Sequence, residues 1–166
     1  RSQSLPGYKN GRVHGYQAEV DPSPRAWSGG IYDEARRGWL YPLELNPEAQ
    51  SAFKMGEWNT YRIECIRNNI RTWVNGVAVS HLIDNMTDKG FIALQVHSIR
   101  NEEDEGHQIK WKNIRIKTEN LEPAPFEGIH VVNLVPNDLS AAEKEKGFEL
   151  LFDGNSTEKW MSPETG

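Results

Sequence analysis

Alternation of apolar and polar positions with a period of two runs through most of the chain, whereas helical periodicity is scarce. This alternation is typical of strands with one buried face, and Gly, Pro, Asn and Asp separate the alternating stretches. The pattern predicts strands at about residues 13–20, 30–33, 39–41, 58–67, 69–74, 77–82, 90–97 and 108–117. Asn75-Gly76 is a strong hairpin signal, because both residues tolerate positive φ. Many short strands with tight turns predict an all-β protein, an antiparallel β-sandwich or barrel.

Three stretches depart from this alternation. Residues 46–56 (NPEAQSAFKMG) are compatible with a short helix. A second helical signal lies in DLSAAEKEKGF, where Ser140 is a good N-cap and Glu143, three residues later, completes a capping box. Residues 119–139 contain three prolines and no clean period, which predicts a linker.

The length and the net charge of the chain limit the number of domains and argue against a nucleic-acid-binding protein. The 166 residues (19.0 kDa) suffice for one domain, or for one domain and part of another, and 37% apolar residues suffice for a core. The net charge of −5 predicts that nucleic acid is not a partner. No apolar run reaches the roughly 18–20 residues that cross a bilayer, so the sequence predicts no membrane span. The single cysteine, Cys65, shares a strand face with Tyr61 and Ile63 and is interpreted as a core thiol.

Two predicted strands carry a polar row opposite an apolar face. Gln17, Glu19 and Asp21 alternate with apolar residues in the first, and Gln95 and His97 do so in the second. A solvated outer face is one explanation, since antiparallel sheets often have one. A binding surface is the other, because amides, carboxylates and an imidazole are unusually specific groups for a merely solvated face.

Within these rows, two positions suit proton transfer. His97 is the best single candidate, because an imidazole has an ordinary pKa near 6.5. Glu19 and Asp21 lie two apart on one strand, about 6.5–7 Å between Cα atoms. That spacing is compatible with a glycosidase-type carboxylate pair or with part of a metal site.

The segment WSGGIYDEARRGWLYP is dense in further candidate chemistry. Gly29-Gly30 permits close backbone approach, and Arg36 and Arg37 can bind an anion or polarise an oxygen. Flat aromatic faces of the kind that stack on sugar rings come from Trp27, Tyr32, Trp39 and Tyr41. The alternative is a loop packed by its own aromatic residues.

Four stretches, in this order, resemble the 3-keto-disaccharide hydrolase family: GYQAEVDPSPRAWSGGIYDEARRGWLYP, GEWNTYRIECIRNNIRTWVNGVAVSHLID, GFIALQVHS and IKWKNIRIK. The resemblance spans residues 1–118 and implies a concanavalin-A-like jelly roll. The tail GFELLFDGNSTEKW resembles the motif that opens the family domain. We therefore expect an incomplete sandwich, with missing strands supplied by another segment or by strand exchange with a neighbouring chain.

This order of motifs implies a division of the chain. Residues 1–118 resemble the second part of a jelly-roll domain, and residues 119–139 remain a linker. Residues 140–166 are then the start of a second similar domain or the opening strand of the same sandwich.

The resemblance also implies a chemistry. Family members act on glycosides whose sugar carries a ketone at C3, which acidifies the proton at C2; its removal expels the C1 substituent, and water then adds. His97 and Glu19 are the implied acid–base residues, and Arg36, Arg37 or a divalent cation would stabilise the enolate. The further substrate-binding candidates are Gln17, Asp21, Tyr32, Trp39, Gln95 and Arg1.

Several alternatives stay open at this point. A non-catalytic carbohydrate-binding module of the same fold would use the aromatic residues and the polar row without turnover. An interaction or scaffold domain is a third possibility. No cofactor is expected apart from the possible divalent cation, and the resemblance suggests a bacterial periplasmic, cell-surface or secreted protein.

Overall fold

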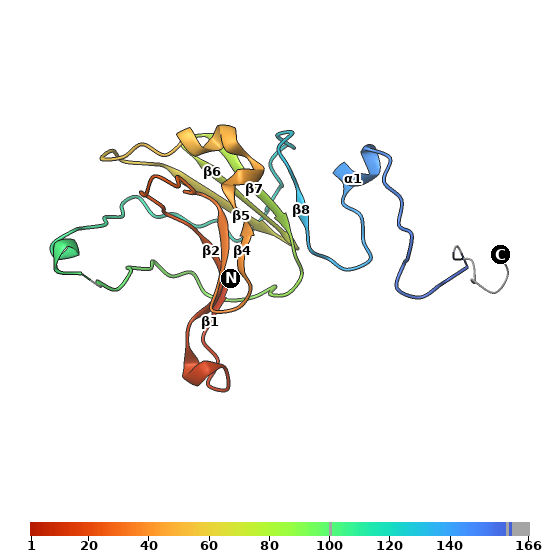
Figure 1. The fold of residues 1–166 in the computed structure, drawn as a ribbon, viewed down its shortest axis with the longest axis horizontal. Helices are drawn as coiled ribbons and strands as arrows, with labels where there is room; N and C mark the ends of the chain where they lie inside the picture. The colour runs from red at the N-terminus through yellow and green to blue at the C-terminus, as the bar shows by residue number, and fades with distance from the viewer. Residues whose placement is uncertain (100, 159, 161–166) are drawn as a thin grey trace.

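Two four-stranded sheets pack face to face in the computed structural model, which describes residues 1–99, 101–158 and 160 (Figure 1). The first sheet contains β1 (Ser2–Gln3), β2 (His14–Ala18), β3 (Ile31–Glu34) and β4 (Gly38–Tyr41), all antiparallel in that order. The second sheet contains β5 (Tyr61–Ile66), β6 (Asn69–Val74), β7 (Val77–Ile83) and β8 (Val132–Asn133), of which only β8 pairs in parallel. The prediction of a mostly antiparallel β-sandwich is therefore confirmed.

The β6–β7 hairpin forms at the dipeptide that the sequence singles out. Asn75 and Gly76 both have positive φ, 51° and 83°, as a tight turn between twisted strands requires. The Asn75 side chain also ties the turn to its surroundings, because its amide nitrogen donates to the Ala52 carbonyl and its oxygen accepts from the Thr60 amide, both at 2.8 Å.

The core lies between the sheets in two clusters. In one cluster, side chains of the first sheet meet side chains of the second: Tyr16, Ile31, Tyr41, Ile70 and Leu82. In the other cluster, residues of two short helical turns meet the β6–β7 hairpin: Leu43, Ala49, Ala52, Val74 and Val79. Cys65 is half-buried against the first cluster, and burial raises the pKa of its thiol. Its placement agrees with a core thiol.

The helical elements are short: 3-10 turns η1 (Lys9–Gly11), η2 (Leu43–Leu45), η3 (Pro47–Ser51) and η4 (Glu102–Asp104), and the helix α1 (Ala141–Glu145). The helix expected at 46–56 is thus a single 3-10 turn, since η3 ends at Ser51. The predicted capping box is confirmed in α1. The Ser140 hydroxyl accepts from the Glu143 amide, and the Glu143 carboxylate accepts from the Ser140 amide.

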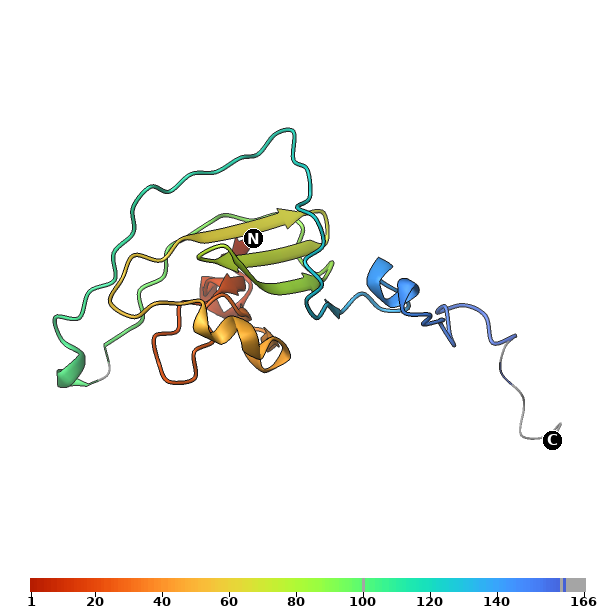
Figure 2. The same ribbon diagram turned by 90° about the horizontal axis from the view of Figure 1, so that it is seen from above.

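The predicted strands at 90–97 and 108–117 are wrong. Among the described residues of these segments, only Phe91 pairs, in an isolated bridge with Ser2, and the chain between β7 and β8 runs as a long excursion beside the sandwich (Figure 2). Ile92 and Val96 are accordingly 72% and 67% exposed. Alternation specifies which side chains share a face, but a strand also needs a neighbouring strand that pairs with its backbone N–H and C=O groups. The neighbour of Phe91 is β1, which is only two residues long and cannot pair with a whole strand.

The stretch 119–139 contacts the second sheet along its outer face. Arg71 donates to the carbonyls of Ala124 and Pro125, both at 2.6 Å, and β8 itself lies in this stretch. After β8 the chain runs away from the sandwich, and α1 lies in this last part of the chain (Figure 1). Whether 119–139 links two domains stays a prediction, and the end of the predicted second unit, at 159 and 161–166, lies outside the described residues.

Candidate functional site

A polar and aromatic row crosses the outer face of the first sheet. Gln17 lies opposite Tyr32 in the β2–β3 register, and Tyr32 lies opposite Trp39 in the β3–β4 register. The strand neighbours of Gln17 and Tyr32, namely Tyr16 and Ile31, point into the core. Strand alternation therefore brings three of the predicted substrate-binding residues together on one half-exposed face.

Three aromatic rings meet at one end of this row. Trp39 makes edge contacts with Tyr32 and with Trp27, at 5.1 and 4.8 Å between ring centroids. Trp27 belongs to the loop between β2 and β3. Tyr41, the fourth candidate for stacking, is fully buried, so it cannot offer a face to a sugar.

The β2–β3 loop is held against the second sheet through Gly29. This residue has a φ of +88°, and a Cβ on it would come within 2.8 Å of Val74 and 2.9 Å of Val79. Its carbonyl accepts from the hydroxyls of Thr72 and Ser80. Close backbone approach, which the sequence predicts for the glycine pair, thus fixes the loop that carries Trp27.

Asp21 organises the same loop. Its carboxylate accepts from the backbone amides of Ser23 and Trp27, and it receives the Nε of Arg25 at 2.8 Å. Burial favours the protonated carboxyl, but the hydrogen bonds from Ser23 and Arg25 outweigh it and lower the pKa of Asp21. The structure therefore places Asp21 beside the row as a buried anchor.

Arg25 stacks on the aromatic cluster. Its guanidinium carbon lies 4.6 Å from the Trp27 ring centroid and 4.8 Å from that of Trp39. These distances are in the range of cation–π contacts. Arg25 was missed at the level of the sequence, because a lone arginine in a Pro-rich loop carries no pattern; its spacing of four from Asp21 was the available signal.

Glu19 lies at the end of β2, next to Gln17 and to the anchored loop. Gln17 Nε2 donates to Glu19 Oε2 at 3.0 Å, while Gln17 Oε1 is buried with no partner among the described residues. Burial raises the pKa of Glu19 above its ordinary value, and the nearby charge of Asp21 raises it further. The charges of Arg25 and His97 act in the opposite direction, so both groups lie within electrostatic reach of this carboxylate.

The two candidates from residues 90–97, Gln95 and His97, both lie outside the strands. His97 is exposed, and its Nδ1 lies 3.1 Å from the Ser98 carbonyl oxygen rather than at a hydrogen-bond distance from Glu19. Gln95 is exposed as well. His97 therefore acts on Glu19 only as a charge that lowers its pKa, and the two residues lie on segments far apart in sequence.

Arg36 and Arg37 lie in a separate ion cluster that faces the core side of the first sheet. Both pair with Asp33, which is fully buried, at N–O distances of 2.6 Å. Arg37 also pairs with Asp84, which accepts from the Tyr16 hydroxyl. Burial favours a protonated Asp84, but hydrogen bonds from Arg37 and Tyr16 prevail and lower its pKa.

Arg1 approaches this same cluster. Its Nη1 donates to the Thr87 carbonyl at 3.4 Å, and Arg36 donates to the Thr87 hydroxyl at 2.7 Å. Three predicted substrate-binding arginines are therefore gathered away from the row, around carboxylates that no sequence pattern singled out. The available signal was the string YDEARR, in which Asp33 precedes Arg36 and Arg37 by three and four positions.

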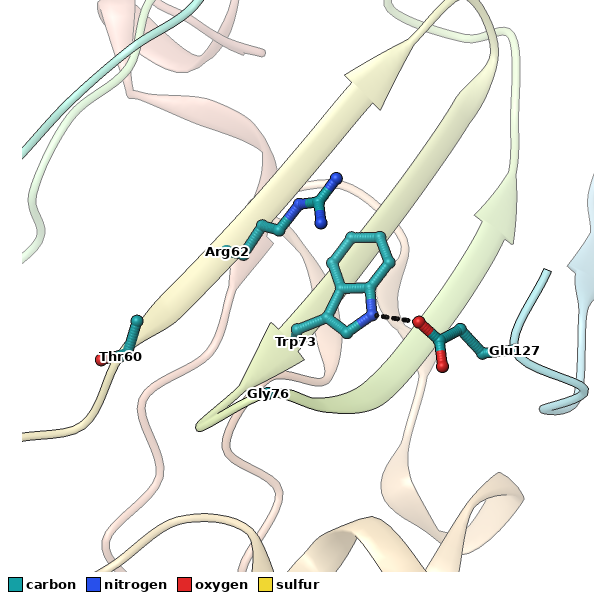
Figure 3. A pocket seen from close by; sticks show the side chains of 5 residues that line it. All are labelled: Thr60, Arg62, Trp73, Gly76 and Glu127. Atoms are coloured by element: carbon teal, nitrogen blue, oxygen red, sulfur yellow. Dashed lines mark hydrogen bonds between the residues drawn. The ribbon is translucent and has the colours of Figure 1, made fainter. Parts of the chain in front are cut away.

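Hollows of the surface occur on the other sheet. One, of about 300 Å³, is lined by Thr60, Arg62, Trp73, Gly76 and Glu127, and Trp73 Nε1 donates to Glu127 across it (Figure 3). A second, of about 460 Å³, lies between the second sheet and residues 121–126. The row on the first sheet is therefore a candidate site because of the side chains that it contains, and not because it coincides with one of these two hollows.

Two structural findings bear on metals and membranes. Within the described residues, no three His, Cys, Asp or Glu side chains gather in an arrangement that could hold a metal ion. In the same part of the chain, every helix is too short or too polar to cross a bilayer.

Comparison with known proteins identifies the family. The family model for 3-keto-alpha-glucoside-1,2-lyase-like domains matches residues 1–117. No curated protein is similar enough to this chain to count as a relative. Since the family model covers well over half of the chain, the protein belongs to the 3-keto-alpha-glucoside-1,2-lyase-like domains, a family whose name implies action on oxidised sugars.

Proposed function

We propose that this protein cleaves 3-keto-glycosides by elimination followed by addition of water, which makes it a hydrolase overall. The observation that carries the proposal is the position of Glu19: a carboxylate with a raised pKa, at the end of a row that contains Gln17, Tyr32 and Trp39. A raised pKa suits a general base that works near neutral pH. The family supplies the substrate class, an oxidised sugar.

In the proposed first step, Glu19 removes the proton from C2 of the sugar. The C2–H bond breaks, its electron pair forms the C2=C3 double bond, and the C3 carbonyl oxygen takes up the negative charge. The pair then returns to restore the ketone, a C1=C2 double bond forms, and the C1–O bond breaks. His97 supplies the proton that the leaving oxygen takes up.

Water completes the reaction. Its oxygen bonds to C1 and a proton returns to C2, so that one glycoside and one water give two free sugars. This route needs a single base and a group for the enolate oxygen, and not two carboxylates at a fixed separation. Of the two carboxylates beside the row, Asp21 pairs with Arg25, whereas Glu19 has no ion pair among the described residues.

Binding of the sugar is assigned to the rest of the row. Tyr32 and Trp39 would stack on the ring, as aromatic faces do in carbohydrate sites. Gln17 would accept a hydrogen bond from a sugar hydroxyl through Oε1, since that buried atom has no partner among the described residues. Gln95 is proposed to contact the sugar from the 90–97 segment.

A non-catalytic carbohydrate-binding module is the second candidate. The observation that favours it is that His97 contacts the Ser98 carbonyl and makes no hydrogen bond with Glu19 among the described residues. Sugar binding, unlike catalysis, needs no proton transfer between these two residues. A periplasmic or cell-surface location is proposed with either function, and fractionation of the producing bacterium tests it. A divalent cation that assists the ketone is tested by assaying the protein before and after dialysis against a chelator.

The deciding experiment is incubation with 3-keto-trehalose, with release of free sugar followed by NMR. We expect release by the wild-type protein and its loss, by about 10²-fold or more, in His97→Ala. His107→Ala, which alters another histidine of the same excursion, is the matched control. Binding without release by a folded wild-type protein would instead establish the binding module.

A further inference from the structure

The structure assigns to Arg25 the role of holding the C3 oxygen of the oxidised sugar, as the group that stabilises the enolate. This inference rests on the proposed function, since it concerns the same site and the same substrate. Arg25 takes the place of Arg36, Arg37 or a divalent cation, to which the resemblance gave this role.

The geometry fixes Arg25 in an unusual way. Asp21 accepts only its Nε, at 2.8 Å, and the two tryptophans Trp27 and Trp39 support the guanidinium plane at 4.6 and 4.8 Å. Asp21 is itself bound by the amides of its own loop, so the anchor is held as well. Arg25 is therefore oriented before any ligand arrives.

The terminal nitrogens of Arg25 remain available. Within the described part of the chain, none of the hydrogen bonds uses its Nη1 or Nη2, and the side chain is 46% exposed. Arg36 and Arg37 differ in this respect. Their side chains are only 12% and 29% exposed, and each is paired with the buried carboxylate of Asp33.

Arg25 is connected to the proposed base through Asp21, which binds it and lies two residues from Glu19 in the sequence. Three charged or titratable groups act on Glu19, namely Asp21, Arg25 and His97, and Arg25 is the one with a permanent positive charge. The ketone oxygen is bonded to C3, the neighbour of C2. When the C2 proton of a sugar faces Glu19, this oxygen therefore lies only two bonds from C2. Arg25 would offer that oxygen its Nη donors, which make no hydrogen bond within the described residues.

The chemistry of a guanidinium fits the demand. When the C2–H bond breaks, charge develops on the C3 oxygen, and a pre-oriented cation with planar N–H donors stabilises it more than it stabilises the ground-state ketone. Arginine has donors and no acceptor, so it matches a carbonyl or enolate oxygen at C3, whereas the hydroxyl proton of an unoxidised sugar finds no partner on it. Arg25 thereby contributes to both rate and selectivity.

The test is Arg25→Met, which keeps most of the side-chain stem and removes the donors. We expect kcat on 3-keto-trehalose to fall by about 10²–10³-fold, with a much smaller change in KM, because the contact strengthens in the transition state. Added methylguanidine should restore part of the lost rate. Arg12→Met is the matched control, since Arg12 is an exposed arginine that pairs with Glu34.

Other outcomes are equally informative. If the wild-type protein cleaves the keto-sugar and Arg25→Met cleaves it within twofold of that rate, the role of Arg25 is wrong while the proposed function stands. If the wild-type protein is folded and inactive, the proposed function fails and takes this inference with it. A loss of rate with no rescue by methylguanidine, together with a lowered melting temperature, would show that Arg25 acts only by packing the loop.

A second variant covers the case in which Arg25→Met does not fold. Arg25→Lys keeps the charge but loses the planar fork and the Nε contact with Asp21. We expect an intermediate loss of kcat and an unchanged circular dichroism spectrum. A folded Arg25→Lys with full activity on 3-keto-trehalose would overturn the proposed role of the planar guanidinium donors.

Discussion

The outer faces of the two sheets carry similar side chains and use them differently. On the first sheet, Arg25 stacks on Trp27 and Trp39. On the second sheet, Arg71 stacks on Trp73 at 5.0 Å in the same manner. The terminal nitrogen atoms of Arg71 donate to the carbonyls of residues 124 and 125, whereas those of Arg25 make no hydrogen bond within the described residues.

The covering segment makes the difference between these faces. Residues 123–127 run over the second sheet, where Glu64 accepts from the Ala124 amide and Trp73 donates to Glu127 (Figure 3). Once a chain segment satisfies its donors, an arginine–tryptophan pair becomes part of the framework. An arginine–tryptophan pair is a candidate for binding only where its donors remain open.

The largest expected effect is on catalysis at the first sheet. Glu19→Gln removes the proposed base while keeping its shape, and we expect kcat on 3-keto-trehalose to fall by about 10²–10⁴-fold. Initial rates measured by NMR check this. Glu48→Gln, the same change at an exposed position of η3, should leave the rate unchanged. Equal rates for the wild-type protein and Glu19→Gln would remove Glu19 from the mechanism.

A large effect on stability is expected at the second sheet. Arg71→Met removes the buried partner of Glu64, which costs about 3 kcal/mol in the free energy of unfolding, the low end for a broken buried pair, because Arg62 and the Ala124 amide still contact the carboxylate. Urea denaturation measures this. Arg62→Met is the control, because Arg62 is 59% exposed and its pair with Glu64 is worth about 1 kcal/mol or less.

The same variant sharpens the contrast between the faces. Where enough folded Arg71→Met remains, its kcat on the keto-sugar should equal that of the wild-type protein, since Arg71 lies on the face away from the proposed site. A selective loss of kcat in a stable Arg71→Met would mean that the second face takes part in the reaction.

A smaller effect concerns the pH dependence of stability. The pKa of Glu19 is raised in the folded protein, mainly by burial, so the folded state binds its proton more tightly than the unfolded state does. Stability from this group is therefore present below the ordinary glutamate pKa of 4.5 and is lost as the pH rises through the raised value. We expect Glu19→Gln to be more stable than the wild-type protein at pH 7 and to match it near pH 3. Melting temperatures at the two pH values check the sign, and a destabilised variant at pH 7 would contradict it.

The smallest effect is expected in α1, which belongs to neither face. Ser140→Ala removes the cap and should destabilise this one helix by about 1 kcal/mol, with no change in the unfolding of the sandwich. Hydrogen exchange of the amides at 141–146 measures it. Ser140→Thr keeps a capping hydroxyl and should exchange like the wild-type protein.

Much of the framework could be predicted from the sequence. Alternation located β2 to β7, and Asn75-Gly76 located the β6–β7 hairpin. The same alternation placed Gln17 on the face opposite the buried Tyr16, whereas Tyr32 and Trp39 were singled out only as aromatic residues. The segments 90–97 and 108–117 were predicted wrongly as strands, because their pattern is strand-like while the structure pairs only Phe91.

The sequence by itself determined the strand faces, the turns and the family, because side-chain alternation and turn preferences depend on neighbouring residues. Only the tertiary structure decided which arginines are occupied. Arg37 is bound by Asp84, 47 positions away, and Arg71 by a carbonyl 53 positions away, whereas no described residue binds the terminal nitrogens of Arg25. Counter-charges and covering segments come from distant parts of the chain, so a local pattern cannot show whether a charged side chain supports the fold or remains free to bind.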